Sequence, residues 1–327
     1  MKAVLCKSFD GASALEVGEI EAPCPKDDEI LIEVRAAPVS YMDMLMAEGK
    51  YQMRPELPYV PGTDAAGVVV GLGANVTRFE LGDRVTCLGW YGAFAEKMTA
   101  KEWKCVRLPD AVDFATGSTV LHNYVTAYYA LVDRANLQKG EKLFVTGAAG
   151  GVGLATVDLG RHLGAQVIAG IGDESKRDIV SEYGATDAVN YQTEDLRERI
   201  KSLTDGRGVD VCFEMLGGEV FTTMGRLMAW GGRLMPIGFA GGEIPSLPMN
   251  LPLLKNYSVV GVFAGAWLDN SPSDAAAAAD KLMHWIAEGM LRPQVHGTMP
   301  LEKAGEAMQL VADRKVQGRV VLTVEPN

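Results

Sequence analysis

The sequence predicts an α/β protein with two domains, one rich in short β-strands and one built on a doubly wound parallel sheet. Residues 1–122 contain short strand-like runs that are broken by Gly, Pro and Asp. From about residue 142, apolar strands alternate with helices. A glycine-rich turn, LFVTGAAGGVG at 143–153, separates the first of these strands from its helix. Together, these three observations favour the two-domain architecture.

The second half of the chain supplies the most regular pattern. We expect strands at 142–147, 166–171, 187–191, 209–215 and 233–238, and helices at 152–163, 175–182, 194–203 and 219–229. Alternation at this pace is typical of a parallel sheet with helices on both faces. The run YSVVGVFAG at 257–265 predicts one further strand at an edge of the sheet.

Composition excludes several classes of function. The net charge is −11 over 327 residues and no basic block is present, which argues against nucleic acid or an anionic membrane as partner. The first residues are too polar for a signal peptide, and no apolar run is long enough to span a membrane. The five cysteines are scattered without C-x-x-C pairs, as in reduced proteins. We therefore expect a cytoplasmic protein.

The glycine-rich turn predicts a dinucleotide site. Its spacing is Ala148-x-Gly150-x-x-Gly153, with alanine at the first glycine of G-x-G-x-x-G. A helix that starts here directs its N–H groups and its positive dipole end at an anion, as when a pyrophosphate is bound. By itself the motif is weak, and a plain strand–turn–helix remains an alternative.

Cofactor preference is determined after the second strand of such a domain. NAD sites place Asp or Glu there, but this chain has Gly170 and Gly172, followed by Lys176 and Arg177. Two cations at this position could meet a 2′-phosphate, which favours NADPH. Asp173 and Glu174 lie nearby and oppose this interpretation, and a solvated helix start is the alternative. Tyr191, at the end of the third strand, could stack near the adenine.

At this point a family resemblance is clear. The chain resembles the medium-chain dehydrogenase/reductase superfamily, and within it the zinc-free quinone oxidoreductases of the zeta-crystallin type. The matching segments are PGTDAAGVV (61–69), GDRV (82–85), GAFAE (92–96), NYVTAYYAL (123–131), GAAGGVG (147–153), MPIGFAGG (235–242) and GRVVL (318–322). The resemblance implies a GroES-like catalytic domain formed by 1–122 and 268–327, with a Rossmann nucleotide-binding domain at 123–267.

The departures from the zinc alcohol dehydrogenases of this superfamily are informative. Where those enzymes have a catalytic Cys and a Gly-His-Glu, this chain has Ser40 with Tyr41, and Gly62-Thr63-Asp64. A catalytic zinc needs about three protein ligands, so we expect no zinc and no other metal. Without a metal, the favoured acceptors are those that take hydride readily, namely a quinone or a conjugated carbonyl.

The resemblance therefore implies a zinc-independent, NADPH-dependent quinone oxidoreductase that works as a homodimer on a small molecule. An enoyl or alkenal double-bond reductase, or a nucleotide-binding protein with little catalysis, is the alternative. The catalytic candidates are Ser40, where the family usually has Asn, with Tyr41 and Tyr51, each either a proton donor or a wall of the pocket. The implied cofactor contacts are Asn123, Thr126, Ala149, Gly150, Gly151, Val152, Gly172, Lys176, Tyr191, Gly238, Phe239, Phe263 and Arg319.

Overall fold

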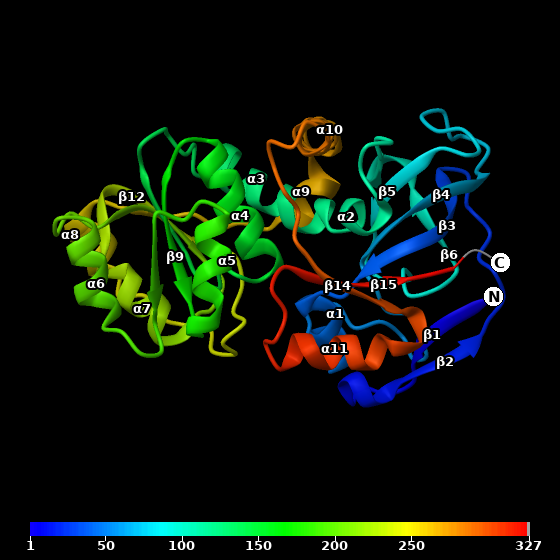
Figure 1. The fold of residues 1–327 in the computed structure, drawn as a ribbon, viewed down its shortest axis with the longest axis horizontal. Helices are drawn as coiled ribbons and strands as arrows, with labels where there is room; N and C mark the ends of the chain where they lie inside the picture. The colour runs from blue at the N-terminus through cyan, green and yellow to red at the C-terminus, as the bar shows by residue number, and fades with distance from the viewer. Residues whose placement is uncertain (326–327) are drawn as a thin grey trace. The chain divides into compact units, whose positions relative to one another are not determined.

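The chain divides into two compact units, which confirms the predicted fold class (Figure 1). The computed structural model describes residues 1–325. The first unit comprises Met1–His122 together with the chain from Leu268 onward, and the second comprises Asn123–Trp267. The second unit is thus an uninterrupted stretch of chain that lies, in sequence, between the two parts of the first.

The first unit is a β-rich domain. Its seven-stranded sheet has the order β14-β15-β3-β4-β5-β7, with β6 also pairing β3, and β1 and β2 form a separate pair. The strands are β1 (Lys2–Cys6), β2 (Leu15–Glu19), β3 (Glu29–Pro38), β4 (Asp64–Leu72), β5 (Arg84–Leu88), β6 (Lys97–Lys101), β7 (Cys105–Arg107), β14 (Val295–Pro300) and β15 (Arg319–Thr323). The helices are α1 (Tyr41–Ala47), α2 (Phe114–Ser118), α10 (Pro272–Ala287) and α11 (Ala304–Ala312).

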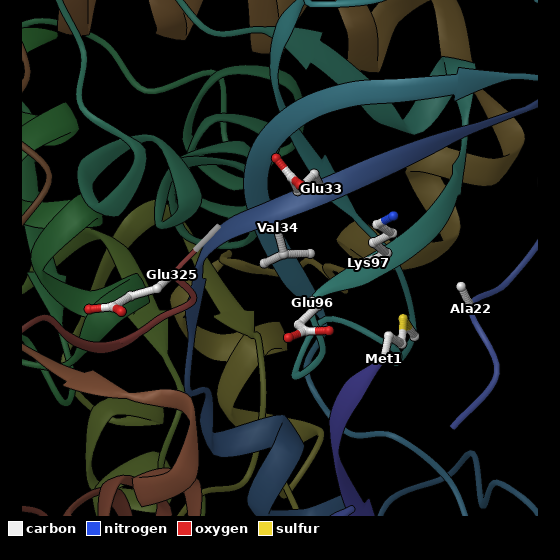
Figure 2. A pocket seen from close by; sticks show the side chains of 7 residues that line it. All are labelled: Met1, Ala22, Glu33, Val34, Glu96, Lys97 and Glu325. Atoms are coloured by element: carbon white, nitrogen blue, oxygen red, sulfur yellow. The ribbon is translucent and has the colours of Figure 1, made fainter. Parts of the chain in front are cut away.

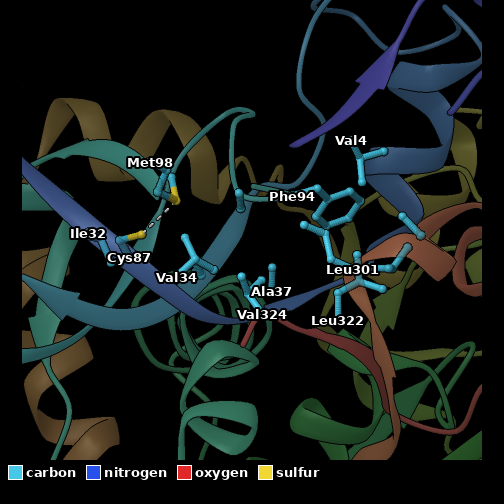
Figure 3. Close-up of a cluster of buried hydrophobic side chains, with 14 of the residues drawn as sticks. Val4, Ile32, Val34, Ala37, Cys87, Phe94, Met98, Leu301, Leu322 and Val324 are labelled. Carbon is cyan, nitrogen blue, oxygen red and sulfur yellow. Dashed lines mark hydrogen bonds between the residues drawn. The ribbon is translucent and has the colours of Figure 1, made fainter. Parts of the chain in front are cut away.

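The core of the first unit joins distant parts of the sequence. Ile32 and Val34 of β3 are fully buried because alternate residues of a strand face the same side. They share a cluster with Phe94 and with Leu322 of β15 (Figure 3). The antiparallel register pairs Leu322 with Ala37, so the last strand completes a sheet that begins near residue 29.

The second unit is a six-stranded sheet in the order β10-β9-β8-β11-β12-β13, with every neighbouring pair parallel. Its strands are β8 (Lys142–Val145), β9 (Gln166–Ile171), β10 (Asp187–Asn190), β11 (Val209–Glu214), β12 (Met228–Pro236) and β13 (Ser258–Val259). Its helices are α3 (Thr126–Tyr128), α4 (Gly151–His162), α5 (Arg177–Glu182), α6 (Leu196–Leu203), α7 (Gly218–Gly225) and α8 (Asn250–Lys255), and α9 (Ala264–Asn270) spans the unit boundary. Strand order reverses between β8 and β11, which is where doubly wound folds bind ligands.

Helices cover both faces of this sheet. On one face, Phe144 and Cys212 from the strands pack with Ile200 of α6 and with Phe221 and Met224 of α7. Helix α4 contacts β8 and β9 and lies apart from α6 and α7 in Figure 1. Because both faces are buried, the strands consist of nearly continuous apolar residues, as the sequence indicated.

Two glycines of the turn after β8 are required by the backbone. Gly147 has a φ of +58°, in the left-handed region that favours glycine. A Cβ on Gly153 would lie 2.2 Å from the carbonyl oxygen of Gly147. Helix α4 therefore packs directly against the turn, and Ala148 takes the place of the motif's first glycine with its side chain fully buried.

Two expected elements differ from the structure. The strand predicted at 257–265 is only Ser258–Val259, and a helix starts at Ala264. Packing accounts for the difference, since the carbonyl of Gly261 accepts a hydrogen bond from Arg134 at 3.1 Å rather than from a strand. Trp267 in the helix is buried and stacks on Tyr129 at 4.5 Å. The helix predicted at 219–229 also ends early, at Gly225, and Met228 begins β12.

Candidate active site

In the second unit, most of the predicted cofactor contacts lie at one edge of the sheet. The glycine turn follows β8, Gly172 follows β9, Tyr191 follows β10, and Gly238 follows β12. Since the strands are parallel, these residues all lie at carboxyl ends, which is where this kind of fold binds its ligand. The structure therefore brings together residues that are far apart in sequence.

The start of α4 is suited to an anion. Its N-cap is Gly150, which has no side chain to occupy the first N–H groups of the helix. Ala149 is buried, whereas Gly150, Gly151 and Val152 are partly exposed. The N–H groups of the first turn and the positive end of the helix dipole are thus arranged as at helix starts that bind phosphate.

The loop after β9 is packed against Tyr191. The Tyr191 N–H donates to the carbonyl of Ile171 at 3.0 Å, and a Cβ on Gly172 would lie 2.9 Å from the tyrosine hydroxyl. Lys176 is half-buried at the end of this loop. Glycine at 172 therefore leaves room for Tyr191 beside the loop that carries Lys176.

Glu214 organises a loop at the switch point, a role that the sequence did not reveal. Its buried carboxylate accepts hydrogen bonds from the N–H groups of Leu216 and Gly217, both at 2.9 Å, and from the Thr146 hydroxyl at 3.2 Å. Burial raises the pKa of this carboxyl group. The acid at the end of β11 is therefore a structural anchor for the loop opposite the glycine turn.

Gly238 and Phe239 lie in a loop that packs on the Glu214 loop. The Ala240 N–H donates to the carbonyl of Met215 at 2.8 Å, and a Cβ on Gly217 would lie 3.1 Å from the Phe239 ring. Phe239 is still 37% exposed. An accessible aromatic ring thus lies at the carboxyl edge, where the family resemblance implies a cofactor contact.

The remaining contacts predicted in this unit are more scattered. Asn123 is buried within π-helical turns at Leu121–Val125, and Thr126 begins α3, which packs on α4. Irregular turns of this kind often mark functional segments. Phe263 is 56% exposed and precedes α9. In sequence, Phe263 lies between the short edge strand β13 and α9.

In the first unit, Ser40 is a helix cap. Its hydroxyl donates to Asp43 Oδ2 at 2.6 Å and accepts from the Asp43 N–H at 3.0 Å, while its own N–H donates to the same carboxylate at 2.7 Å. This reciprocal capping box fixes the start of α1. Because its single proton is already donated, the hydroxyl has no second proton to offer a substrate.

Arg319 and Asp64 form a buried ion pair in the same unit. The guanidinium lies 3.3 Å from Asp64 Oδ2, and the side chains are 6% and 0% exposed. The Thr63 hydroxyl donates to the same oxygen at 2.9 Å, and the His122 N–H donates to Oδ1 at 3.2 Å. Sequence analysis had placed Arg319 at the cofactor, and the structure shows it buried against Asp64.

The pKa values of this cluster are shifted mainly by burial. Burial raises the pKa of Asp43 and of Asp64 to about 6, although the hydrogen bonds and the Arg319 charge act in the opposite direction. Burial together with Arg319 lowers the pKa of His122 to about 3, so this imidazole is neutral at physiological pH. The cluster thus contains one cation, Arg319, and two carboxyl groups that lose their protons at a higher pH than carboxyl groups in water do.

The two candidate tyrosines differ in their surroundings. Tyr41 is the first residue of α1 and is 37% exposed. Tyr51 is half-buried, its N–H donates to the carbonyl of Leu45 at 3.2 Å, and burial raises the pKa of its phenol. Tyr51 therefore stays protonated at neutral pH and has a proton to donate.

Within residues 1–325, no group of three or more His, Cys, Asp or Glu side chains is arranged to hold a metal ion. No described helix combines the length and the apolar character needed to cross a bilayer. Figure 2 shows a cavity of about 340 Å³ in the first unit, whose lining includes Glu33, Glu96 and Glu325. This cavity contains none of the predicted site residues.

Two family models match the chain. Residues 26–110 match the alcohol dehydrogenase GroES-like domain, and residues 151–283 match the zinc-binding dehydrogenase model. A quinone oxidoreductase-like protein 2 homolog from Nematostella vectensis is 37% identical over 299 residues, covering 91% of this chain and 82% of that protein. Human quinone oxidoreductase is 33% identical, covering 98% of this chain and 97% of that protein.

The chain belongs to the quinone oxidoreductase family of the medium-chain dehydrogenases/reductases. Quinone oxidoreductase from Escherichia coli, solved as a complex with NADPH, superimposes with a TM-score of 0.93 at 26% identity and covers 99% of this chain and 100% of its own. This family membership confirms the resemblance inferred from the sequence motifs, and the GroES-like match at residues 26–110 lies within the first unit.

We predict that Asp43→Asn changes how the stability of this quinone oxidoreductase family member depends on pH. The native pKa of about 6 lies above the unfolded value of 3.8, so the native carboxyl binds more protons between these pH values. Wild-type stability therefore falls as pH rises through this window, and asparagine removes that loss. Between pH 4 and pH 7 the variant should gain about 2 kcal/mol relative to wild type, measured by urea unfolding. A constant difference between the two proteins would contradict the prediction.

Proposed function

We propose that this protein is an NADPH-dependent reductase of small molecules, acting on a quinone or a conjugated carbonyl compound. The observation that carries the proposal is the carboxyl edge of the second unit. There a helix start without a capping side chain, at Gly150, adjoins a loop with glycine at 172 and a cation at Lys176. The first feature suits a pyrophosphate, and the second replaces the acid of an NAD site with a partner for a 2′-phosphate. The NADPH complex of the Escherichia coli relative supports it.

Zinc independence is part of the proposal. The catalytic zinc of related dehydrogenases needs about three N, S or O ligands, and the matching positions here are Ser40, Thr63 and Asp64. The Ser40 hydroxyl is used by Asp43, and the Asp64 carboxylate is neutralised by Arg319. This donor set does not fit a catalytic zinc, so the protein's own groups must stabilise charge that develops on the acceptor.

The chemistry then rests on orientation and on one proton. When bound, NADPH supplies the hydride that reduces the acceptor. In our proposal, Phe239 of the second unit orients the nicotinamide ring. In the first unit, Tyr41 orients the acceptor, and the Tyr51 phenol gives its proton to the oxygen or carbon that becomes negative. Ser40 acts indirectly, by holding the start of α1 and so the position of Tyr41.

An enoyl or alkenal reductase and a nucleotide-binding protein with little catalysis are the competing functions. The first would use the same hydride and the same proton donor on a C=C bond.

A cytoplasmic location is also part of the proposal. The five free cysteines support it, since four of them are buried thiols, as is typical of proteins in a reducing compartment.

We also propose that the protein is a homodimer. The short strand β13 is an edge of the six-stranded sheet, and helix α8, which directly precedes it in sequence, exposes three apolar side chains together with its N-cap residue. Met249, Leu253 and Leu254 are 72%, 78% and 69% exposed. An apolar surface beside an open strand edge is typical of a self-association site.

The purified protein should oxidise NADPH in the presence of a quinone or an enone, with a kcat/KM for NADPH at least tenfold above that for NADH, because one well-placed cation contributes about this much. The measurement follows NADPH absorbance across quinones, enones and enoyl thioesters, before and after dialysis against a metal chelator. Activity should survive the chelator. NADPH binding without turnover of any acceptor would establish the nucleotide-binding alternative instead.

Replacing Tyr51 by phenylalanine should lower kcat by about tenfold or more while leaving KM for NADPH nearly unchanged, because only the proton is lost. Tyr41→Phe is the matched control and should retain most of the activity. Steady-state kinetics with the best acceptor measures both variants. If both lose activity equally, or neither does, Tyr51 is not the donor.

The variant Leu253→Glu/Leu254→Glu should convert the protein from twice its 35.1 kDa chain mass to that of a single chain in sedimentation velocity. Charges placed in an apolar interface lose hydration without gaining partners. Leu81→Glu is the control, since Leu81 is likewise 66% exposed but belongs to the first unit. A wild-type protein that sediments as a single chain would remove the dimer from the proposal.

A further inference from the structure

Arg177, the second cation after β9, is already engaged by other groups. Its Nε donates to Glu174 Oε1 and its Nη2 donates to Glu174 Oε2 at 3.1 Å, so the two groups form a bidentate pair. Nη2 also donates to Glu194 at 3.1 Å, and Nη1 donates to the carbonyl of Ala188 at 2.7 Å. Four of the five N–H donors of a guanidinium are thus used within the protein. With one N–H donor left, Arg177 could bind a phosphate through two hydrogen bonds only by breaking one of these bonds.

The two carboxylates are themselves fixed at the end of the third strand. Glu194 Oε1 accepts from the Asn190 N–H at 2.8 Å, and Glu174 Oε2 accepts from the Asn190 side chain at 3.3 Å. Arg199 lies 2.8 Å from the second oxygen of Glu194. The hydrogen bond from Arg177 lowers the pKa of Glu174, and the Asn190 N–H, with Arg177, lowers that of Glu194. Both groups are therefore ionised at neutral pH.

This cluster adjoins the proposed 2′-phosphate end of the cofactor site. Asn190 is followed directly by Tyr191, whose hydroxyl lies beside Gly172, and Lys176 directly precedes Arg177. Asp173, a third acid of the loop, accepts from the N–H and hydroxyl of Ser175 at 2.9 and 2.6 Å. A phosphate here would meet several fixed negative charges unless cations neutralised them.

We propose that Arg177 acts as the counter-ion of Glu174 and Glu194, so that Lys176 alone faces the 2′-phosphate and selects NADPH over NADH. Arg177 is then a positioning residue that contributes to specificity without touching the cofactor. This inference rests on the proposed NADPH site and assigns the two cations of the loop to different tasks. Of the two acids that oppose NADPH in the sequence, Glu174 is neutralised by Arg177, whereas Asp173 accepts hydrogen bonds from Ser175.

The test uses adenosine 2′,5′-bisphosphate and adenosine 5′-monophosphate as probes, with dissociation constants measured by calorimetry on the full chain. Arg177→Gln should weaken binding of the bisphosphate by about tenfold and binding of the monophosphate by less than about twofold, because the exposed carboxylates repel the extra phosphate. The triple variant Arg177→Gln/Glu174→Gln/Glu194→Gln should restore bisphosphate binding to within about threefold of wild type.

The matched control is Arg177→Gln/Glu182→Gln/Glu198→Gln, which removes the same number of charges from exposed carboxylates outside the cluster. This control should bind the bisphosphate as weakly as Arg177→Gln does. Binding of the monophosphate verifies that each variant keeps a folded site. Equal weakness of both triple variants would show that Arg177 itself binds the phosphate and would overturn the inference while leaving the NADPH site intact. A wild-type protein that binds both probes equally would instead overturn the proposed NADPH preference.

Discussion

The buried ion pair between Arg319 and Asp64 joins residues that are 255 positions apart in sequence. It links β15, the last strand, to the start of β4, and the same carboxylate receives hydrogen bonds from Thr63 and His122. Removing one partner of such a pair costs about 3–5 kcal/mol, because a charge is then left unpaired in the interior. The first unit therefore depends on this contact for the closure of its sheet, and α1 depends on the neighbouring carboxyl group of Asp43.

The same cluster includes Ser40 and Asp64, which lie where the sequence departs from the zinc dehydrogenases. Positions that hold a metal in related dehydrogenases are here occupied by groups that satisfy one another. Arg319 supplies a fixed positive charge inside the protein, and Ser40 and Asp43 use their polar atoms to start a helix. The carboxylates of Asp43 and Asp64 thus accept hydrogen bonds from groups of the protein itself.

Much of the fold was predictable because it depends on local patterns. The alternation of apolar strands and helices located β8 to β12, and the glycine turn located the start of α4, because strand burial and turn conformation are encoded by neighbouring residues. The end of the sheet was not predictable in this way. Residues 257–265 have the composition of a strand, but the strand is only Ser258–Val259, and a helix whose Trp267 stacks on Tyr129 begins at Ala264.

In the candidate site too, features that depend on local spacing were predictable, and features that depend on remote partners were not. Gly172 and Lys176 were identifiable from their distance to the glycine turn, whereas the tasks of Arg177, Glu214 and Arg319 depend on partners that are remote in sequence. A sequence pattern shows which residues are charged but not which charges cancel. Pairing of charges is a property of the tertiary structure, and for that reason the acidic residues near Lys176 gave an ambiguous indication.

The interruption of the first unit by the second has a consequence for synthesis of the chain. When Trp267 has left the ribosome, every strand of the second unit is present and its parallel sheet can form. At that moment β3 still lacks its neighbour β15, and the carboxylate of Asp64 still lacks Arg319. The end of β3 that pairs with β15 therefore stays unpaired until β15 has been synthesised, although β3 itself is synthesised before the second unit.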